Sequence, residues 1–175
     1  MYKTKHIVWL TGASGVGKTT LLSCLKEKHS KENNWEFIKF DSIGVPSAED
    51  MVKEYGSGEN WQCAKTYEWI GKMVNGYPGK EVIIMDGQAN LEFIKKGFEK
   101  QNFKDYQIVL IDCEQDVMIN RLIDERQQAW LADEDMKNWL KFLRRQAQDF
   151  GAPIIETSHI GPNQVAEKFE KILKC

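Results

Sequence analysis

Residues Gly12 to Thr19 have the composition and spacing of a phosphate-binding loop. They fit the pattern G-x-x-x-x-G-K-[ST] and directly follow the apolar run 5–11. Glycines let such a loop wrap around a phosphate, so that backbone N–H groups and the next helix N-terminus point at it. In this pattern the lysine, Lys18, reaches the β- and γ-phosphates, and the Thr19 hydroxyl ligates Mg²⁺. We expect nucleotide contacts from Gly12, Ala13, Ser14, Gly15, Val16, Gly17, Lys18, Thr19 and Thr20.

Two aspartates follow later apolar runs and are candidates for chemistry. Asp41 comes after "WEFIKF", where it could orient or deprotonate an acceptor hydroxyl, or could serve the backbone turn at 42–44 instead. Asp86 ends "EVIIMD", where it could hold Mg²⁺ through water, since hard cations prefer oxygen ligands. Its alternative role is a cap for the helix that follows.

Three arginines are candidates for contacts with the transferring phosphate, because the guanidinium fork suits phosphate oxygens. Arg126 continues the line of Met118 and Leu122 at four-residue steps, which places it near the cleft. Arg121 precedes it on the same helix, and Arg144 flanks the apolar stripe of a later one. Arg145 points further outward and is expected to be solvated.

Between the second and third runs, residues 57–76 carry Trp61 and Trp69 beside polar side chains. The two tryptophans are eight residues apart and lie near one face of a helix, which favours a role in the core over stacking on an acceptor ring. Gln88 and Asn90 follow the third run and are candidate polar contacts to the acceptor.

The elements that must position these residues alternate along the chain. Short apolar runs at 5–11, 35–40, 81–86, 106–112 and 153–157 are typical of buried parallel strands. Helical periodicity falls between them, at 18–29, 47–56, 59–75, 89–101, 115–126, 134–149 and 163–174. Asp133 can cap the sixth helix. This alternation predicts an α/β fold, a parallel sheet covered on both faces.

Length and composition narrow the function classes. At 175 residues we expect one domain over 1–175, and a formal net charge of −2 gives no basic excess for nucleic acid. The opening apolar run is too short for a signal peptide or a membrane span, so we expect a cytoplasmic protein. The four cysteines are widely spaced, which indicates structural thiols and no disulfide or zinc framework.

The order of these features resembles that of the small P-loop kinases. The resemblance rests on the loop 12–19, on Asp41 in "FDSIGVPS" and Asp86 in "IIMDGQ", on the arginine pair in "NRLIDERQQ", and on "ETSHIGPNQV" after the last strand. Together they look like the shikimate, gluconate, adenylylsulfate and chloramphenicol kinase group within the nucleoside-monophosphate-kinase-like fold. The order covers nearly the whole chain, but only the phosphate loop is specific by itself.

The resemblance implies a three-layer P-loop fold with five parallel strands in the order 2-3-1-4-5. It further implies a nucleotide over strand 1, acceptor-covering helices at about 42–77 and a small lid at about 121–135. No acceptor signature of any one of these kinases is present, so the resemblance names no substrate. The string "DSIG" fits one GTPase motif, but no guanine-reading N-K-x-D ends a later strand.

The sequence therefore predicts transfer of a phosphoryl group from ATP, with Mg²⁺, to a hydroxyl or phosphate of a small-molecule acceptor. The predicted catalytic residues are Lys18, Asp41, Arg121, Arg126 and Arg144, and the predicted metal ligands are Thr19 and Asp86. A nucleoside triphosphate hydrolase and a nucleotide sensor without acceptor chemistry remain alternatives, because the loop serves all three classes. The choice between ATP and GTP, and between monomer and homodimer, stays open.

Overall fold

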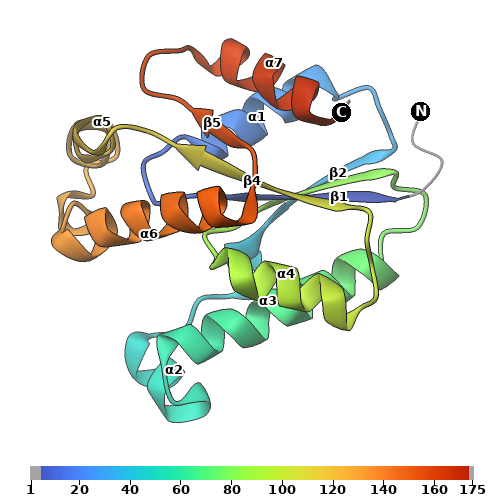
Figure 1. Ribbon diagram of the computed structural model, residues 1–175, viewed down its shortest axis with the longest axis horizontal. Coiled ribbons are helices and arrows are strands. Elements are labelled where there is room, and N and C mark those ends of the chain that lie inside the picture. The colour runs from blue at the N-terminus through green and yellow to red at the C-terminus, as the bar shows by residue number, and fades with distance from the viewer. Residues whose placement is uncertain (1–4, 174–175) are drawn as a thin grey trace.

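The computed structural model describes residues 5–173, and its centre is a parallel sheet of five strands (Figure 1). The strands lie in the order β2-β3-β1-β4-β5, and every neighbouring pair is parallel. Their bounds are β1 His6–Thr11, β2 Trp35–Lys39, β3 Val82–Asp86, β4 Tyr106–Asp112 and β5 Ile154–Glu156. The predicted fold class and strand order are confirmed.

Within the described residues, seven α-helices surround this sheet, in the places where the sequence periodicity predicts them. They are α1 Lys18–Lys28, α2 Ala48–Tyr55, α3 Gly58–Asn75, α4 Leu91–Lys100, α5 Gln115–Asn120, α6 Glu134–Phe150 and α7 Pro162–Leu173. Short turns of helix occur at Phe40–Ile43, Arg121–Glu125 and Ala129–Leu131, of which the second is a π-helical continuation of α5. Lys174 and Cys175, at the end of the last predicted helix, lie outside the described residues.

The central strand β1 packs against helices on both sides because its residues alternate between the two faces of the sheet. Val8 and Leu10 belong to the apolar cluster that includes α1 and α7. Ile7 and Trp9 belong to the opposite cluster, with α3 and α4. Figure 1 shows these helix pairs above and below the sheet. Burial on both faces explains why β1 is a continuous apolar run with no polar alternation.

The carboxyl ends of the strands define the edge where the candidate residues gather. The loop after β1 leads directly into α1, the turn at Phe40–Ile43 follows β2, and the polar segment 87–90 follows β3. In open parallel sheets, ligands bind at this edge, in the crevice beyond the strand ends. Cys24, Cys63 and Cys113 are free thiols, as expected, while Cys175 is not described.

Candidate active site around the phosphate loop

The loop between β1 and α1 depends on glycine at two positions for different reasons. At Gly12 a Cβ atom would lie 2.3 Å from the carbonyl oxygen of Ile111, so only glycine lets the loop pass beside β4. At Gly17, φ is +104°, a left-handed conformation that residues with a Cβ avoid. Glycine loses more conformational entropy on folding than other residues, but it lets the backbone of this loop approach a ligand closely.

The N-terminus of α1 is left open, unlike those of four other helices. Side chains of Ser47, Ser57, Asn90 and Asp133 accept hydrogen bonds at the starts of α2, α3, α4 and α6. At α1 the capping position is Gly17, no side chain accepts, and the first turn has no acidic residue. The free N–H groups and the positive end of the helix dipole therefore face the loop, where they favour an anion.

Lys18 lies folded back over the loop that it belongs to. Its Nζ donates to the carbonyl oxygens of Gly12 at 2.7 Å and Ala13 at 2.8 Å. Burial lowers the pKa of Lys18 to about 8, against the opposing attraction of Asp86. Loss of hydration thus changes the pKa of Lys18 more than the attraction of the nearby carboxylates does. A bound phosphate would favour the charged ammonium form of the side chain.

Thr19 and Asp86 meet at the predicted metal site. The Thr19 hydroxyl donates to Oδ2 of Asp86 over 3.2 Å, and Asp86 is only 8% exposed. Burial raises the pKa of Asp86, against the attraction of Lys18. The alternative that Asp86 caps the next helix is wrong, because Asn90 caps α4 with its side chain. Within residues 5–173, no cluster of three or more His, Cys, Asp or Glu could hold a metal.

A cavity of about 350 Å³ opens on the β2 and β3 side of the loop. Asp41 lines it together with Lys18, and the cavity wall also includes Ser14, Lys39, Phe40, Val45, Trp61 and Gln88. Asp41 is exposed, and its carboxylate forms no hydrogen bond or ion pair within the described part of the chain. The turn at Phe40–Ile43 is closed by backbone, since Gly44 N–H donates to the Asp41 carbonyl. The Asp41 side chain is thus available to a ligand.

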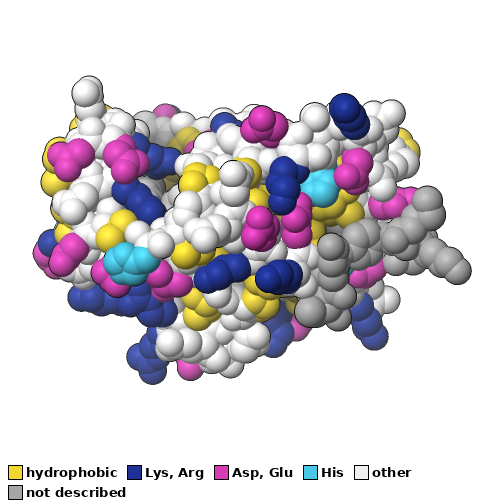
Figure 2. Space-filling view, turned by 90° about the horizontal axis from the view of Figure 1, so that it is seen from above, with side chains coloured by type: hydrophobic (Ala, Val, Ile, Leu, Met, Phe, Trp, Pro, Cys, Tyr) yellow, Lys and Arg dark blue, Asp and Glu magenta, His cyan; other side chains and the backbone are white. Residues whose placement is uncertain are grey.

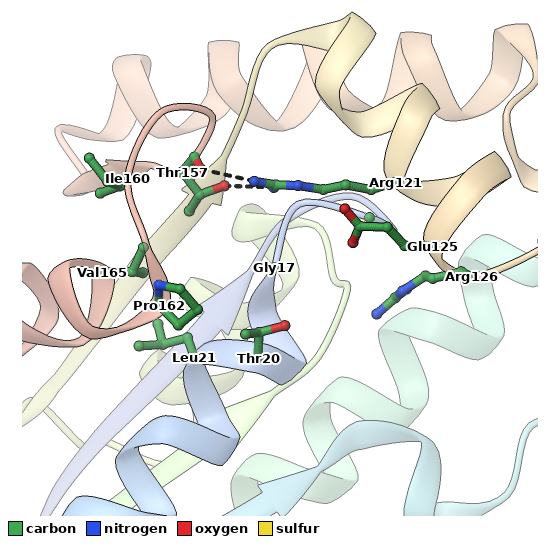
Figure 3. A pocket seen from close by; sticks show the side chains of 11 residues that line it. Gly17, Thr20, Leu21, Arg121, Glu125, Arg126, Thr157, Ile160, Pro162 and Val165 are labelled. Atoms are coloured by element: carbon green, nitrogen blue, oxygen red, sulfur yellow. Dashed lines mark hydrogen bonds between the residues drawn. The ribbon is translucent and has the colours of Figure 1, made fainter.

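A second cavity, of about 210 Å³, lies on the opposite side of the loop, toward α5 and α7 (Figure 3). Its lining combines Gly15, Gly17 and Thr20 with the apolar side chains of Ile160, Pro162 and Val165. Arg121 forms one wall, where Nη1 donates to Thr157 Oγ1 at 3.0 Å and Nη2 to the Thr157 carbonyl at 2.9 Å. The buried Thr157 hydroxyl donates in turn to the Val16 carbonyl at 2.7 Å, which ties β5 to the loop.

Arg126 lines both cavities and is exposed at the end of the π-helical turn. Figure 3 shows its side chain extending toward the first turn of α1. Its charge also contributes to lowering the pKa of Lys18, so the two cations are close enough to interact. The structure therefore places Arg126 beside the phosphate loop and between the two cavities.

Arg144 lies elsewhere, in an ion pair with the end of β4. Its Nε donates to Oδ2 of Asp112 at 2.5 Å, and its Nη2 donates to Oδ1 at 3.1 Å and to the Cys113 carbonyl at 3.0 Å. It lines neither cavity at the loop. The guanidinium fork, whose geometry also suits phosphate, here binds the buried Asp112 carboxylate.

The polar and aromatic candidates between β2 and α4 divide into core and cavity residues. Trp61 and Trp69 are each 7% exposed and belong to the core cluster, as the helical spacing predicts. Trp61 also lines the larger cavity, edge-on to Phe40 at 5.9 Å between ring centroids. Gln88 accepts a hydrogen bond from Ser14 at 3.2 Å and lines the same cavity, whereas Asn90 caps α4.

Sequence reasoning did not single out several residues that line the two cavities. Lys39 precedes the predicted Asp41 by two residues, and Glu125 precedes Arg126. Thr157, Ile160 and Pro162 lie within "ETSHIGPNQV". The family resemblance pointed to this segment as a whole but assigned no role to these three residues. Only the tertiary structure brings this segment against the loop.

Comparison with known proteins supports the assignment of the fold. The family model of the KAP family P-loop domain matches residues 1–69, which include β1, the loop and α1. No curated protein sequence matches the chain.

Solved kinase structures match nearly the whole chain. Shikimate kinase from Acinetobacter baumannii, in complex with shikimate, superposes with a TM-score of 0.67 at 14% identity, over 99% of this chain and 95% of that one. Shikimate kinase from Aquifex aeolicus superposes with a TM-score of 0.63 at 21% identity, over 96% of both chains. A gluconokinase from Sinorhizobium meliloti gives 0.66 at 14%, over 95% of this chain and 90% of that one. The chain therefore has the P-loop fold shared by shikimate kinases and gluconokinases.

Proposed function

We propose that this protein is an ATP- and Mg²⁺-dependent kinase that phosphorylates a hydroxyl group of a small molecule. The observation that carries the proposal is the pair of cavities that meet at one phosphate loop. Both are lined by Gly15, Gly17 and Arg126, and they extend to opposite sides. Phosphoryl transfer needs a donor and an acceptor in line across the transferring group, which this arrangement can provide.

The smaller cavity suits the nucleoside part of ATP. Its apolar wall of Ile160, Pro162 and Val165 faces the Arg121 guanidinium, whose position is fixed by Thr157. A purine ring can stack between a planar guanidinium and apolar side chains. The adjoining loop and the uncapped start of α1 would then receive the phosphates, with Lys18 on the β- and γ-phosphoryl groups.

The larger cavity suits the acceptor. The Asp41 carboxylate can accept the proton of an acceptor hydroxyl as that oxygen attacks the γ-phosphorus. Phe40, Val45 and Trp61 supply an apolar wall, and Ser14 and Gln88 supply hydrogen-bonding groups. A cavity with a base at the far side of the loop favours a kinase over a hydrolase, whose second substrate is water.

The Thr19 hydroxyl and the Asp86 carboxylate fit a Mg²⁺ ion, since both are oxygen ligands beside the phosphate loop. When bound, Mg²⁺ neutralises charge on the β- and γ-phosphate oxygens. Two protein oxygen ligands match a metal whose coordination is completed by phosphate oxygens and water. The raised pKa of Asp86 reflects a buried carboxylate that a cation would stabilise in its charged form.

Arg126 and the segment that follows it complete the proposed site. We assign residues 121–135 to a lid that closes over the phosphates, and residues 42–77 to the cover of the acceptor. Closure would bring the Arg126 guanidinium onto the developing charge and exclude water from the reacting groups. Arg121 would orient the nucleotide, while Arg144 would act through Asp112 rather than on phosphate.

A panel of hydroxyl-bearing metabolites, each incubated with ATP, Mg²⁺ and the protein, tests this function. At least one acceptor should raise ADP release well above the basal rate, with one phosphorylated product formed for each ADP. The Asp41→Asn variant is the control for the acceptor side. Basal ADP release that no acceptor increases would favour the hydrolase, and nucleotide binding without turnover would favour the sensor.

A further inference from the structure

A third cavity lies apart from the two that meet at the phosphate loop. It has a volume of about 480 Å³ and lies among the N-terminal parts of α3, α4 and α6. Its charged and aromatic lining consists of Glu59, Asp135, Phe93, Trp139 and Phe142, and amide side chains complete it. Neither the phosphate loop nor the proposed base reaches this space, so its chemistry is considered separately.

Three aromatic rings give the cavity its apolar character. Trp139 and Phe142 stack with 5.3 Å between ring centroids at an interplanar angle of 24°. Phe142 is 40% exposed, so its ring is accessible from solvent beside the cavity. The Nε1–H of Trp139 is buried and has no hydrogen-bond partner in the described part of the chain. The aromatic faces favour a flat or apolar body, and an indole face also attracts cations.

The charges around the cavity have one sign. Glu59 and Asp135 line it, and neither forms an ion pair or side-chain hydrogen bond within residues 5–173. No lysine or arginine is part of the lining. Lys137, two residues beyond Asp135, is engaged by Glu134 at 2.6 Å. The two carboxylates are thus without a counter-ion.

The helix N-termini beside the cavity would by themselves favour an anion, but each of them has a side-chain cap. Ser57 and Asp133 accept from the first turns of α3 and α6. At α4, Asn90 accepts from Glu92 N–H, while the Leu91 N–H donates to Gln146 at 3.1 Å. With the caps in place and carboxylates in the first turns, the charge that a ligand meets in this cavity is negative.

We propose that this cavity binds an organic ammonium group carried on an apolar or aromatic body. The rings would hold the body and one face of the cation, and the two carboxylates would neutralise its charge. Because Glu59 and Asp135 are exposed, the charge contribution is screened by salt and the affinity is modest. The chemistry that the site recognises is therefore that of an amine with an attached ring or short aliphatic skeleton.

Gln62 connects the lining of this cavity to a residue of the proposed acceptor site. Gln62 lines the third cavity, and its Nε2 donates to the Gln88 carbonyl at 3.3 Å while its Oε1 accepts from Asn90 N–H at 3.1 Å. Gln88 lines the acceptor cavity.

Binding of three matched probes to the nucleotide-free full chain tests the proposal by isothermal titration calorimetry. The probes are 2-phenylethylammonium, neutral 2-phenylethanol and anionic 3-phenylpropanoate. We expect the ammonium to bind about fivefold or more tightly than the alcohol, and the carboxylate to bind most weakly. Replacing both carboxylates, Glu59→Gln with Asp135→Asn, should abolish the preference for the ammonium. Glu134→Gln, on the same helix turn but outside the cavity, should preserve it.

Equal affinity for ammonium and alcohol, tightest binding of the carboxylate, or no binding of any probe would overturn the proposal. So would a preference that survives in the double variant, whose fold is checked by its thermal melting curve. The measurement contains no nucleotide, so a failure of the kinase proposal leaves its result unchanged. A lost ammonium preference, conversely, leaves the kinase proposal standing.

Discussion

At the scale of single residues, the site combines side chains whose burial makes their charges sensitive to a ligand. Lys18 is partly buried against the carbonyls of its own loop, and loss of hydration lowers its pKa to about 8. Asp86 is buried beside Thr19, and this burial raises its pKa. Both shifts have the same cause, loss of hydration, and each would be reversed by a partner of opposite charge. These shifts are what the proposed binding of a polyphosphate and a cation would require.

Lys18→Ala should abolish turnover, because it removes the cation that stabilises the transferring phosphoryl group. The barrier should rise by about 3 kcal/mol or more, a rate loss on the order of 10²-fold. Steady-state ADP release under saturating ATP measures it. Lys26→Ala is the control: it removes a charge from the exposed face of the same helix, and its turnover should be near normal. Near-normal turnover of Lys18→Ala would exclude the phosphate-loop role.

Asp41→Asn should separate acceptor chemistry from nucleotide binding. Asp41 lines only the larger cavity, so loss of the base should lower kcat by about 10²-fold while ATP affinity stays unchanged. Calorimetric titration with a non-hydrolysable ATP analogue provides the second readout. Glu49→Gln, on the exposed first turn of α2, is the matched control. Loss of nucleotide binding in Asp41→Asn would reassign Asp41 to the metal or to the fold.

At the scale of elements, side-chain contacts hold the strand ends in place around the loop. The Arg144–Asp112 pair links α6 to β4, and Arg121 with Thr157 links the π-helical turn to β5. Both contacts lie at the carboxyl edge of the sheet. We infer that these arginines act mainly by positioning the walls of the site.

Arg144→Met should destabilise the fold more than it impairs chemistry, because it leaves the buried Asp112 carboxylate without its ion-pair partner and with the Cys113 N–H as a hydrogen-bond donor. Breaking such a partly exposed pair should cost about 2 kcal/mol in the free energy of unfolding, read from urea titration. Arg145→Met is the control, since Arg145 and Asp149 are exposed and 3.9 Å apart. Unchanged stability with lost activity would instead make Arg144 a phosphate contact.

The segment after Arg126 should behave as a lid. Residues 127–130 are mostly exposed, Gln127 has φ of +53°, and Trp130 is 70% exposed, so little packing holds this part of the segment before Leu131 contacts the core. Hydrogen exchange of residues 127–133 should slow when a non-hydrolysable ATP analogue binds, and Arg126→Ala should lower kcat more than ATP affinity. Equal exchange in both states would leave no basis for a lid.

Sequence reasoning predicted elements better than individual contacts. The positions of the strands and helices could be predicted from the spacing of apolar residues along the chain. β1 is an example, because burial on both faces of the sheet requires a continuous run of apolar residues. The roles of Arg121 and Arg144 did not follow, since a guanidinium suits a carboxylate or a carbonyl as well as phosphate, and Asp112 and Thr157 are distant in sequence. The sequence also left open whether Asp86 caps the next helix. Only the structure, in which Asn90 caps α4, excludes that role.

At the scale of the whole molecule, the strand order places the loop after β1 between two flanking regions. β3 lies on one side of β1 and β4 on the other, so the segments after β2 and β3 form one cavity and those after β4 and β5 form the other. Figure 2 shows basic and acidic side chains distributed together over the face above α5 and α7. Within residues 5–173, no helix is long and apolar enough to span a bilayer.

The central claim, that both cavities take part in one transfer reaction, is tested most directly by following where the γ-phosphoryl group goes. Phosphorus NMR of one reaction with ATP, Mg²⁺ and an acceptor found in the metabolite panel resolves ADP, free phosphate and phosphorylated product together. The account predicts that product equals ADP and that free phosphate stays at the basal level, with product formation lost in Asp41→Asn. Free phosphate equal to ADP, with no phosphorylated acceptor, would contradict the account and make the protein a hydrolase.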